Sequence, residues 1–410
     1  MNAEITKPRR EAMANAMEIN QMTIVFAKLE SEGIEKFSQD NHFLYFTGLN
    51  IPEAVLCVLK TPNKVTECLF IQRGIPEKEV WDGKKMTAKE AAEASGVDTI
   101  MYLEDFYPTL SSYCPSINKV WANVGTPVLN RPLSHALFML EPMRKIYPNI
   151  IIENMNTLVR PLRAVKSDWE VEQLQRAIDL TGQGIVNIMK QAKAGMKEYE
   201  LEAILYYELQ KNGVQRWGFA PIIAGGINAA TLHYKQNNCV VEESDVVLLD
   251  VGASYLNYSA DITRCFPVSG TFSPRQKEIY AEVLAVQKEI ILMMKPGVGM
   301  TALNEKTNEL IQQACIRLGL IEDPKDFRRY YMHSIGHHLG LDTHDLGARD
   351  SILEAGCVIT VEPGIYIPEE GIGIRIEDDI LITETGNRNL SINIPKEIDQ
   401  IEKIMRDARS

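Results

Sequence analysis

The sequence predicts an α+β protein of two domains, a smaller α/β domain in residues 1–158 and a larger domain in residues 159–410. Three observations support this prediction. The 410 residues exceed the usual size of a single domain. The first part alternates short apolar runs with helical segments. Near residue 160, a proline-containing stretch precedes a strong helix start, which indicates a new domain.

The elements follow from local patterns. In the first domain, we expect strands in the apolar runs at residues 54–59, 66–71, 99–102 and 120–124. In the second, Ser167 and Glu170 form a capping box, and apolar residues at helical spacing from Val171 to Ile188 predict a long amphipathic helix. Further helices are expected over residues 198–211 and 273–294 and in the C-terminal stretch "IPKEIDQIEKIMRD".

Composition restricts the partners and the compartment. The net charge of −12 argues against nucleic acid and anionic membrane surfaces as partners. The N-terminal stretch has no apolar core of the kind found in signal peptides, and no run approaches the ~18 apolar residues of a membrane span. The seven cysteines are scattered and form no C-x-x-C pair, which indicates buried thiols. We therefore expect a cytoplasmic protein that binds neither nucleic acid nor membranes.

Two aspartates stand where an apolar strand would not tolerate a lone charge. Asp250 follows the apolar residues 246–249, and Asp261 lies in a second strand-like run, residues 259–266. A hairpin with a four-residue loop at 254–257 would place the two directly opposite, with Cβ atoms roughly 4.5–5.5 Å apart. Like charges so placed favour a bound cation. The alternative is that one aspartate caps a turn and the other pairs with Arg264.

A second pair of acids repeats the pattern. Glu362 follows one apolar run and Glu377 lies in the next, with a Pro-Glu-Glu-Gly turn midway between them. This places the two glutamates opposite each other, unless Pro363 and Gly364 insert a bulge. The alternative interpretation is that these acids form salt bridges with side chains of the paired strands, for instance with Arg375.

Histidines are concentrated in the same domain. Five of the seven lie there, four of them within "HSIGHHLGLDTH". A single core histidine is more often merely hydrogen-bonded than a metal ligand. The glycines and the missing H-E-x-x-H acid argue against a zinc helix. We expect a glycine-rich strand or turn that brings one or two imidazoles to the acid pairs.

Four carboxylates with an imidazole predict an oxygen-rich site for two divalent ions, and this donor set favours Mn²⁺. Their charge balances two such ions and leaves a bridging hydroxide as the additional anion. Two ions so placed activate water and polarise a carbonyl, which is hydrolytic chemistry. No Gly-x-Ser-x-Gly elbow is present, so a serine hydrolase has no support.

The same motifs resemble those of the proline-specific pita-bread metallopeptidases, most closely aminopeptidase P. The matching stretches are "HSIGHHLGLDTHD", "LLDVGASYLNYSADITRCFPVSG", "TVEPGIYIP" and "GIGIRIEDDILIT". The resemblance implies that the second domain has the pita-bread (creatinase/aminopeptidase-like) fold. It also implies five metal ligands, namely Asp250, Asp261, His337, Glu362 and Glu377.

The resemblance further implies an activity and additional site residues. The expected enzyme is an Xaa-Pro aminopeptidase that uses a metal-bridging hydroxide to cleave the N-terminal residue from peptides with proline at position 2. Glu362 would shuttle the proton, and His233 and His344 would hydrogen-bond the substrate carbonyl as further catalytic residues. His333 and Arg375 are expected to bind substrate. A homo-oligomer, either a dimer or a tetramer, is also expected.

The N-terminal stretches "KPRREAMANAM" and "NHFLYFTGLNIPEAVLCV" are similar to the first domain of aminopeptidase P. The motifs leave an Xaa-Pro dipeptidase (prolidase) as an alternative. A non-catalytic peptide-binding module of this fold would have lost metal ligands, and creatine-cleaving relatives lack the metal set. Two positions depart from the family. Thr343 replaces isoleucine or valine, and His42 replaces an aspartate directed towards Arg375, a role that Asp40 would have to take.

Overall fold

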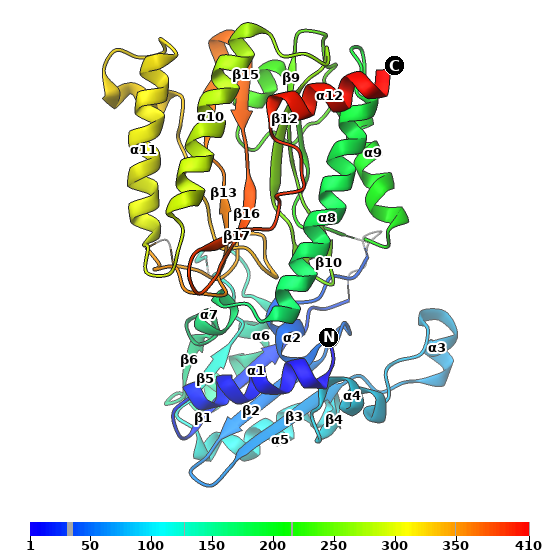
Figure 1. Cartoon of the computed structure of the whole chain (residues 1–410). Coiled ribbons are helices and arrows are strands. Elements are labelled where there is room, and N and C mark those ends of the chain that lie inside the picture. Colours follow the sequence, from blue (N-terminus) through cyan, green and yellow to red (C-terminus); the bar gives the residue numbers. More distant parts are fainter. Residues whose placement is uncertain (31–35, 127, 215, 349, 410) are drawn as a thin grey trace. The chain divides into compact units, whose positions relative to one another are not determined.

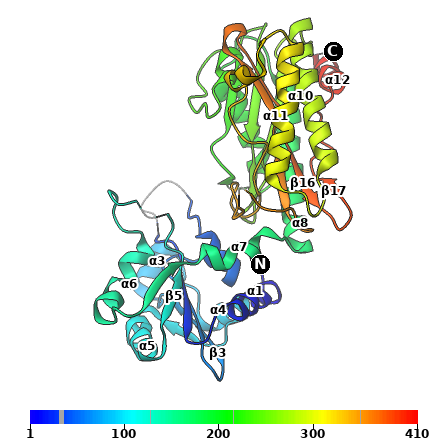
Figure 2. The same cartoon turned by 90° about the vertical axis from the view of Figure 1, so that its left-hand side faces the viewer.

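The computed structural model describes residues 1–30, 36–126, 128–214, 216–348 and 350–409. They form two compact units, Met1–Leu162 and Arg163–Ser410. The predicted domain boundary at 158/159 falls inside helix α7 (Asn156–Ala164) and stays a prediction. Figures 1 and 2 show the elements of each unit from two directions.

The first unit is built on a six-stranded mixed sheet with the order β4-β3-β2-β1-β5-β6. One face of this sheet packs on α5 and α6 through a continuous apolar core that includes Ile24, Phe106 and Leu140. Helices α1 and α2 contact the sheet as well, and Met17, just after α1, meets Thr23 on the opposite face of β1. All four predicted strands are present within one residue or two of the expected limits.

The strands of this unit are β1 Gln21–Phe26, β2 Val55–Lys60, β3 Val65–Ile71, β4 Ile100–Tyr102, β5 Lys119–Ala122 and β6 Ile151–Asn154. Its helices before α7 are α1 Ala3–Ala16, α2 Asn41–Thr47, α3 Pro76–Asp82, α4 Ala88–Ser95, α5 Phe106–Tyr113 and α6 His135–Ile146, with 3₁₀ turns η1 Leu103–Asp105 and η2 Cys114–Ser116.

The second unit combines short antiparallel sheets with two helix pairs, α8 with α9 and α10 with α11 (Figure 1). The predicted capping box of Ser167 and Glu170 starts α8, and the helix expected over residues 198–211 is confirmed as α9. Ser273 caps α10, so the third expected helix is present too. The predicted closing helix is α12, which contacts α8.

The helices of this unit are α8 Asp168–Gln191, α9 Glu198–Lys211, α10 Pro274–Met293, α11 Met300–Arg317 and α12 Ile398–Arg409, with 3₁₀ turns η3 Gly226–Ala230, η4 Pro324–Arg329 and η5 Pro368–Glu370. Its strands are β7 Arg216–Trp217, β8 Ile222–Gly225, β9 Val246–Val251, β10 Ala253–Tyr255, β11 Tyr258–Ser259, β12 Ile262–Pro267, β13 Val358–Val361, β14 Gly364–Ile367, β15 Ile372–Arg375, β16 Asp378–Ile382 and β17 Asn387–Asn389.

The first acid pair has a different register from the predicted one, which was wrong by two residues. Thr263, not Asp261, lies opposite Asp250. The connection is a two-residue turn at Leu256 and Asn257, whose φ angles are 47° and 70°, instead of a four-residue loop. Leucine rarely adopts positive φ, so the sequence pattern did not indicate a two-residue turn of this type. A shift of two residues preserves the face, and the two aspartates remain diagonal neighbours on one side of the sheet.

The second acid pair has the predicted register. The register of the β13–β16 pair continues unchanged in the β14–β15 pair on the other side of the two glutamates. Glu362 therefore lies opposite Glu377 without a bulge. The ladder opens at this point. Glu362 N–H donates to Ile335 O, and Glu377 N–H donates to Thr263 O. Both glutamates therefore occupy a gap in the ladder, where the backbone binds other segments.

The histidine segment, residues 333–344, forms neither a helix nor a regular strand apart from a bridge between His338 and Ile359. Gly336 allows this segment to approach the sheet closely, because a Cβ there would lie 1.9 Å from the carbonyl oxygen of Thr360. The absence of a side chain at this position thus permits the neighbouring imidazole to reach the acid pairs.

Six cysteines are buried and Cys239 is exposed, which corrects the expectation that all seven thiols are buried. In the described part of the chain, no helix combines the length and the apolar character that crossing a membrane requires.

Candidate active site

Three groups with metal-ligating atoms meet in the second unit. One ligand atom each of Asp261, His337 and Glu377 lies within 4.8 Å of the other two. His337 Nε2 is 3.3 Å from Asp261 Oδ2 and 3.8 Å from Glu362 Oε1. The structure thus brings together an imidazole and three carboxylates that come from the histidine segment, the first acid pair and the second.

Arg375 connects the remaining aspartate to this cluster. Its Nη2 donates to Asp250 Oδ2 at 2.5 Å, and its Nε donates to Thr263 Oγ1 at 3.0 Å. The threonine hydroxyl in turn donates to Glu377 Oε2 at 2.6 Å. Asp250 Oδ1 is buried and has no hydrogen-bond partner among the described residues. One guanidinium therefore orients both acid pairs while leaving a carboxylate oxygen unsatisfied.

The carboxylates raise one another's pKa values. Burial raises the pKa of Asp261 well above its usual range, and the negative charges of Asp250 and Asp379 raise it further. Burial also raises the pKa of Glu377, with Asp261 as the next cause. The pKa of Glu362 is raised by burial as well. Without positive ions, a site of this kind is electrostatically costly.

The hydrogen bonds of His337 determine which ring nitrogen faces the carboxylates. Nδ1 lies 3.0 Å from the carbonyl oxygen of His338, so this nitrogen carries the proton and donates it. In the neutral ring, Nε2 then presents a lone pair to Asp261 and Glu362. A lone pair that faces carboxylates is repulsive unless a cation lies between them, which is the arrangement of a metal-ligating histidine.

His333 lies at the edge of the cluster and is linked to Arg375 through a tyrosine. Its Nδ1 donates to Ser334 O, and its Nε2 accepts a bond from Tyr366 Oη at 2.8 Å. Tyr366 also accepts from Arg375 Nη1 at 3.1 Å. Burial lowers the pKa of His333 to about 4, and the charge of Arg375 contributes. The ring is therefore neutral near pH 7.

His344 packs edge-on against the ring of His337, with 4.3 Å between the ring centroids. Burial lowers its pKa, and the proximity of His337 and His233 lowers it further. His233 is exposed on the segment that follows η3. The structure thus places His344 against the ring of His337, and both predicted catalytic histidines are exposed.

The donor set fits divalent metal ions. Several oxygen donors and one imidazole nitrogen converge, one carboxylate oxygen is orphaned, and the Nε2 lone pair points at the carboxylates. Oxygen-rich sets of this kind suit Mn²⁺ and similar ions better than they suit soft, thiolate-binding metals.

Three residues near the site were not predicted from the sequence. Thr263 and Tyr366 connect Arg375 to Glu377 and His333, and Asp379 Oδ2 accepts the backbone N–H of Asp261 at 3.2 Å. Strand alternation could have indicated Thr263, because it follows Asp261 by two residues on the same face. No local pattern indicates the other two.

The two alternative interpretations of the acids are not what the structure shows. Arg264 pairs with Asp378 at 2.7 Å in a fully buried bridge, and not with an aspartate of the first pair. Arg375 pairs with Asp250, and not with a glutamate of the second pair. Among the described residues, neither arginine forms a salt bridge with Asp261 or with either glutamate, although the charge of Arg375 counteracts the rise in their pKa values.

The family departures have local explanations. Thr343 Oγ1 donates to Gly218 O at 3.1 Å, so the hydroxyl connects the histidine segment to the residue that follows β7. The Asp40 side chain accepts from the backbone N–H groups of His42 and Phe43 and caps α2. Asp40 is thus used locally in the first unit.

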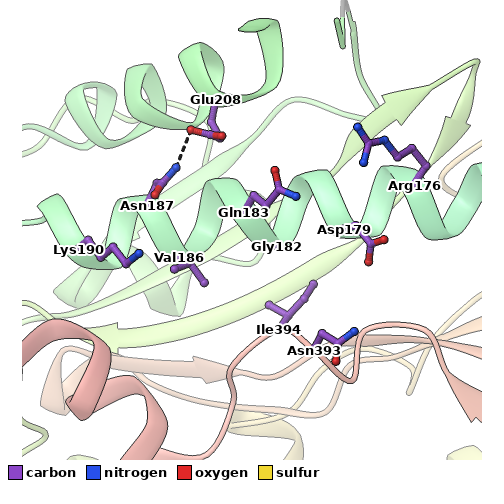
Figure 3. A pocket seen from close by; sticks show the side chains of 10 residues that line it. All are labelled: Arg176, Asp179, Gly182, Gln183, Val186, Asn187, Lys190, Glu208, Asn393 and Ile394. Atoms are coloured by element: carbon purple, nitrogen blue, oxygen red, sulfur yellow. Dashed lines mark hydrogen bonds between the residues drawn. The ribbon is translucent and has the colours of Figure 1, made fainter. Parts of the chain in front are cut away.

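A separate open cavity of about 470 Å³ runs along α8 (Figure 3). Asn187 on α8 donates to Glu208 on α9 there at 2.6 Å, and Ile394 closes another side. The cavity contains none of the predicted site residues, so its size does not relate it to the chemistry.

The sequence model of metallopeptidase family M24 matches residues 172–384, and that of the aminopeptidase P N-terminal domain matches residues 6–121. The chain belongs to metallopeptidase family M24. It is therefore a hydrolase with the pita-bread fold in its second unit, and the predicted resemblance to aminopeptidase P is confirmed.

Two relatives that match this M24 protein over nearly their full length carry the same name. The Xaa-Pro aminopeptidase of Haemophilus influenzae is 33% identical over 97% of this chain and 96% of that protein. The Escherichia coli Xaa-Pro aminopeptidase is 33% identical over 98% and 97%. The structure of E. coli aminopeptidase P with the inhibitor Pro-Leu superposes with a TM-score of 0.92 at 31% identity, over 100% of this chain and 99% of that one.

Proposed function

We propose that this M24 protein is a dinuclear-metal aminopeptidase that hydrolyses the N-terminal Xaa-Pro bond of peptides. The observation that carries the proposal is the convergence of two acid pairs and the Nε2 lone pair of His337 around an unsatisfied Asp250 oxygen. The full-length relatives named Xaa-Pro aminopeptidase support the substrate class.

In this proposal Asp250, Asp261, His337, Glu362 and Glu377 hold two divalent ions, with Mn²⁺ preferred because four of the five groups are carboxylates. When bound, such ions activate water as a nucleophile, in the form of a bridging hydroxide, and polarise the substrate carbonyl. Arg375 keeps Asp250 oriented, and the Nδ1–H bond of His337 fixes the neutral tautomer in which Nε2 can bind a metal ion.

The chain's own groups handle the proton and the carbonyl. Glu362 is partly exposed in the gap of the ladder, so its carboxylate can accept a proton and return it to the leaving proline nitrogen. His233 and His344 hydrogen-bond the substrate carbonyl and stabilise the oxyanion that forms on it. In this proposal His333 and Arg375, which Tyr366 links, bind the substrate.

Specificity follows from the chemistry of the bond. An Xaa-Pro peptide bond has no N–H, so a peptidase that grips this donor rejects it. A site that contacts the carbonyl through histidines and leaves a proline-shaped space accepts it. The homo-oligomeric state and the cytoplasmic location remain predictions.

The test compares three peptides with the purified protein. Ala-Pro-Ala should be cleaved, Ala-Ala-Ala far more slowly, and Ala-Pro less efficiently than Ala-Pro-Ala. Chelation should abolish the activity, and Mn²⁺ should restore it best. Faster cleavage of Ala-Pro would favour the dipeptidase alternative, and full activity in EDTA from a metal-free sample would refute the metal mechanism.

A further inference from the structure

Glu198 is a fully buried carboxylate that lies outside the acid pairs. It occupies the first turn of α9, where the positive end of the helix dipole stabilises a negative charge. A buried carboxylate is costly unless its oxygens are saturated by donors. The partners of Glu198 therefore show what the charge is used for.

Among the described residues, its carboxylate has four partners, all of them uncharged donors from one segment. Oε1 accepts Gly225 N–H and Asn228 Nδ2–H, each at 2.9 Å. Oε2 accepts Tyr234 Oη–H at 2.7 Å and Cys239 N–H at 2.9 Å. The carboxylate thus gathers residues 225–239 around itself without a cation among these partners.

This segment carries His233 between the bonded residues. Two donors to Glu198 precede the histidine, and two follow it, the nearer being the adjacent Tyr234. The His233 ring is exposed and makes no hydrogen bond to another described residue. The direction of the ring therefore depends on the backbone that holds it.

The other side of the segment meets the strand that carries Arg375. A Cβ on Gly373 would lie 2.0 Å from Ala229 O, so η3 lies directly against β15. Proximity to His233 also contributes to the lowered pKa of His344. The segment is thus held between Glu198 on one side and the strand of the active site on the other.

We propose that Glu198 is the positioning residue of His233: its carboxylate fixes residues 225–239 so that the imidazole points at the substrate carbonyl. This inference rests on the role of His233 in the proposed function. Glutamine at 198 keeps the size of the side chain but presents an NH₂ group where two of the four donors need an acceptor. The geometry of the segment must then change while the metal-binding groups stay intact.

The experiment compares Glu198→Gln with Glu208→Gln. Glu208 is a matched control, a nearly buried glutamate on the same helix whose carboxylate binds Asn187, Lys211 and Asn212; Figure 3 shows its bond to Asn187. The first readout is the His233 ring resonance in protein labelled on histidine with ¹³C, assigned by its loss in His233→Ala. The chemical shift of this resonance should change in E198Q and stay the same in E208Q. This readout needs no turnover, so it tests the inference even if the peptide assay rejects the proposed function.

The second readout is a double-mutant cycle on Ala-Pro-Ala hydrolysis. E198Q should lower kcat/KM by about tenfold to a hundredfold in the wild-type background, because small misplacements of a catalytic group have effects of this order. In the His233→Ala background the same change should cost less than about twofold. Metal content should be equal in all variants.

An unmoved His233 resonance in E198Q, or an equal loss of kcat/KM in both backgrounds, would overturn the inference and leave Glu198 a purely structural residue. If E198Q does not fold, Tyr234→Phe replaces it, since this change removes one donor to Oε2 only. It should shift the same resonance by a smaller amount, and no shift would again overturn the inference.

Discussion

Replacing Asp345 by asparagine should strongly destabilise the second unit. The carboxylate, only 2% exposed, accepts Arg163 Nη2 at 2.5 Å and lies 3.3 Å from Lys166 Nζ, and these cationic side chains are 2% and 1% exposed. Asparagine keeps the shape but removes the charge. Removing one partner from a buried ion pair costs about 3–5 kcal/mol, because the remaining charge stays desolvated.

The measurement is calorimetric melting of the full chain. For a unit of this size, each kcal/mol shifts the melting temperature by about 2–4 °C, so the expected loss is about 6–20 °C. Asp342→Asn is the matched control. It contacts the same guanidinium at 2.6 Å but its side chain is 46% exposed, and exposed pairs contribute about 0–1 kcal/mol.

The pH dependence gives a second check. Burial by itself raises the pKa of Asp345, but the charges of Arg163 and Lys166 outweigh it and hold this pKa below its ordinary value. A depressed carboxylate pKa stabilises the fold above the unfolded value of about 3.9 and loses this contribution as pH falls through the folded value. The difference between wild type and D345N should therefore be constant near neutral pH and shrink below about pH 4. Equal losses for D345N and D342N would refute the reasoning.

Five further predictions concern the site and the elements that support it. Mn²⁺ should raise the melting temperature of chelated protein, since a ligand that binds only the native state stabilises it; no shift in calorimetry would argue against a metal site. Asp261→Asn and Glu377→Gln should each reduce peptide hydrolysis by orders of magnitude with little change in circular dichroism. His338→Ala should be much milder on activity, because this buried ring bonds Ser351 and not the carboxylates, and equal loss would mean that the wrong face was assigned. Gly373→Ala should cost about 1–3 kcal/mol or more in urea unfolding, because its Cβ would meet a carbonyl of η3, and a neutral result would contradict the close approach. Ser273→Ala should cost about 1 kcal/mol by removing the N-cap of α10, again measured by urea unfolding, whereas no change would show that the cap is dispensable.

Local sequence was sufficient where one segment determines its own structure. The capping box at Ser167 and Glu170 marked the start of α8, and the spacing of apolar residues marked its length. Strand alternation placed Asp250 and Asp261 on one face even though their register was wrong, because a side chain returns to the same face every two residues. The second register was correct because the turn lies at a proline and a glycine that locate it.

The register of the first hairpin depended on a local conformation that the residue types disfavour. Leu256 takes positive φ only because the paired strands on either side impose it. The left-handed backbone conformation costs a single non-glycine residue only about 1–2 kcal/mol, and packing of the flanking strands outweighs this cost. The sequence could therefore place the turn but not select its type.

The sequence by itself determined which residue types carry the chemistry, namely two acid pairs, a glycine-rich histidine segment and the family to which their motifs belong. Tertiary structure alone decided what each group contacts. It placed Arg375 on Asp250, the proton of His337 on Nδ1 and the segment of His233 on Glu198. The physical reason is that the face on which a side chain lies and the period of a helix depend only on neighbouring residues. The contacts of Arg375 and Glu198, in contrast, join segments far apart in the chain. Such contacts form only when packing brings those segments together, and no local pattern encodes their distance.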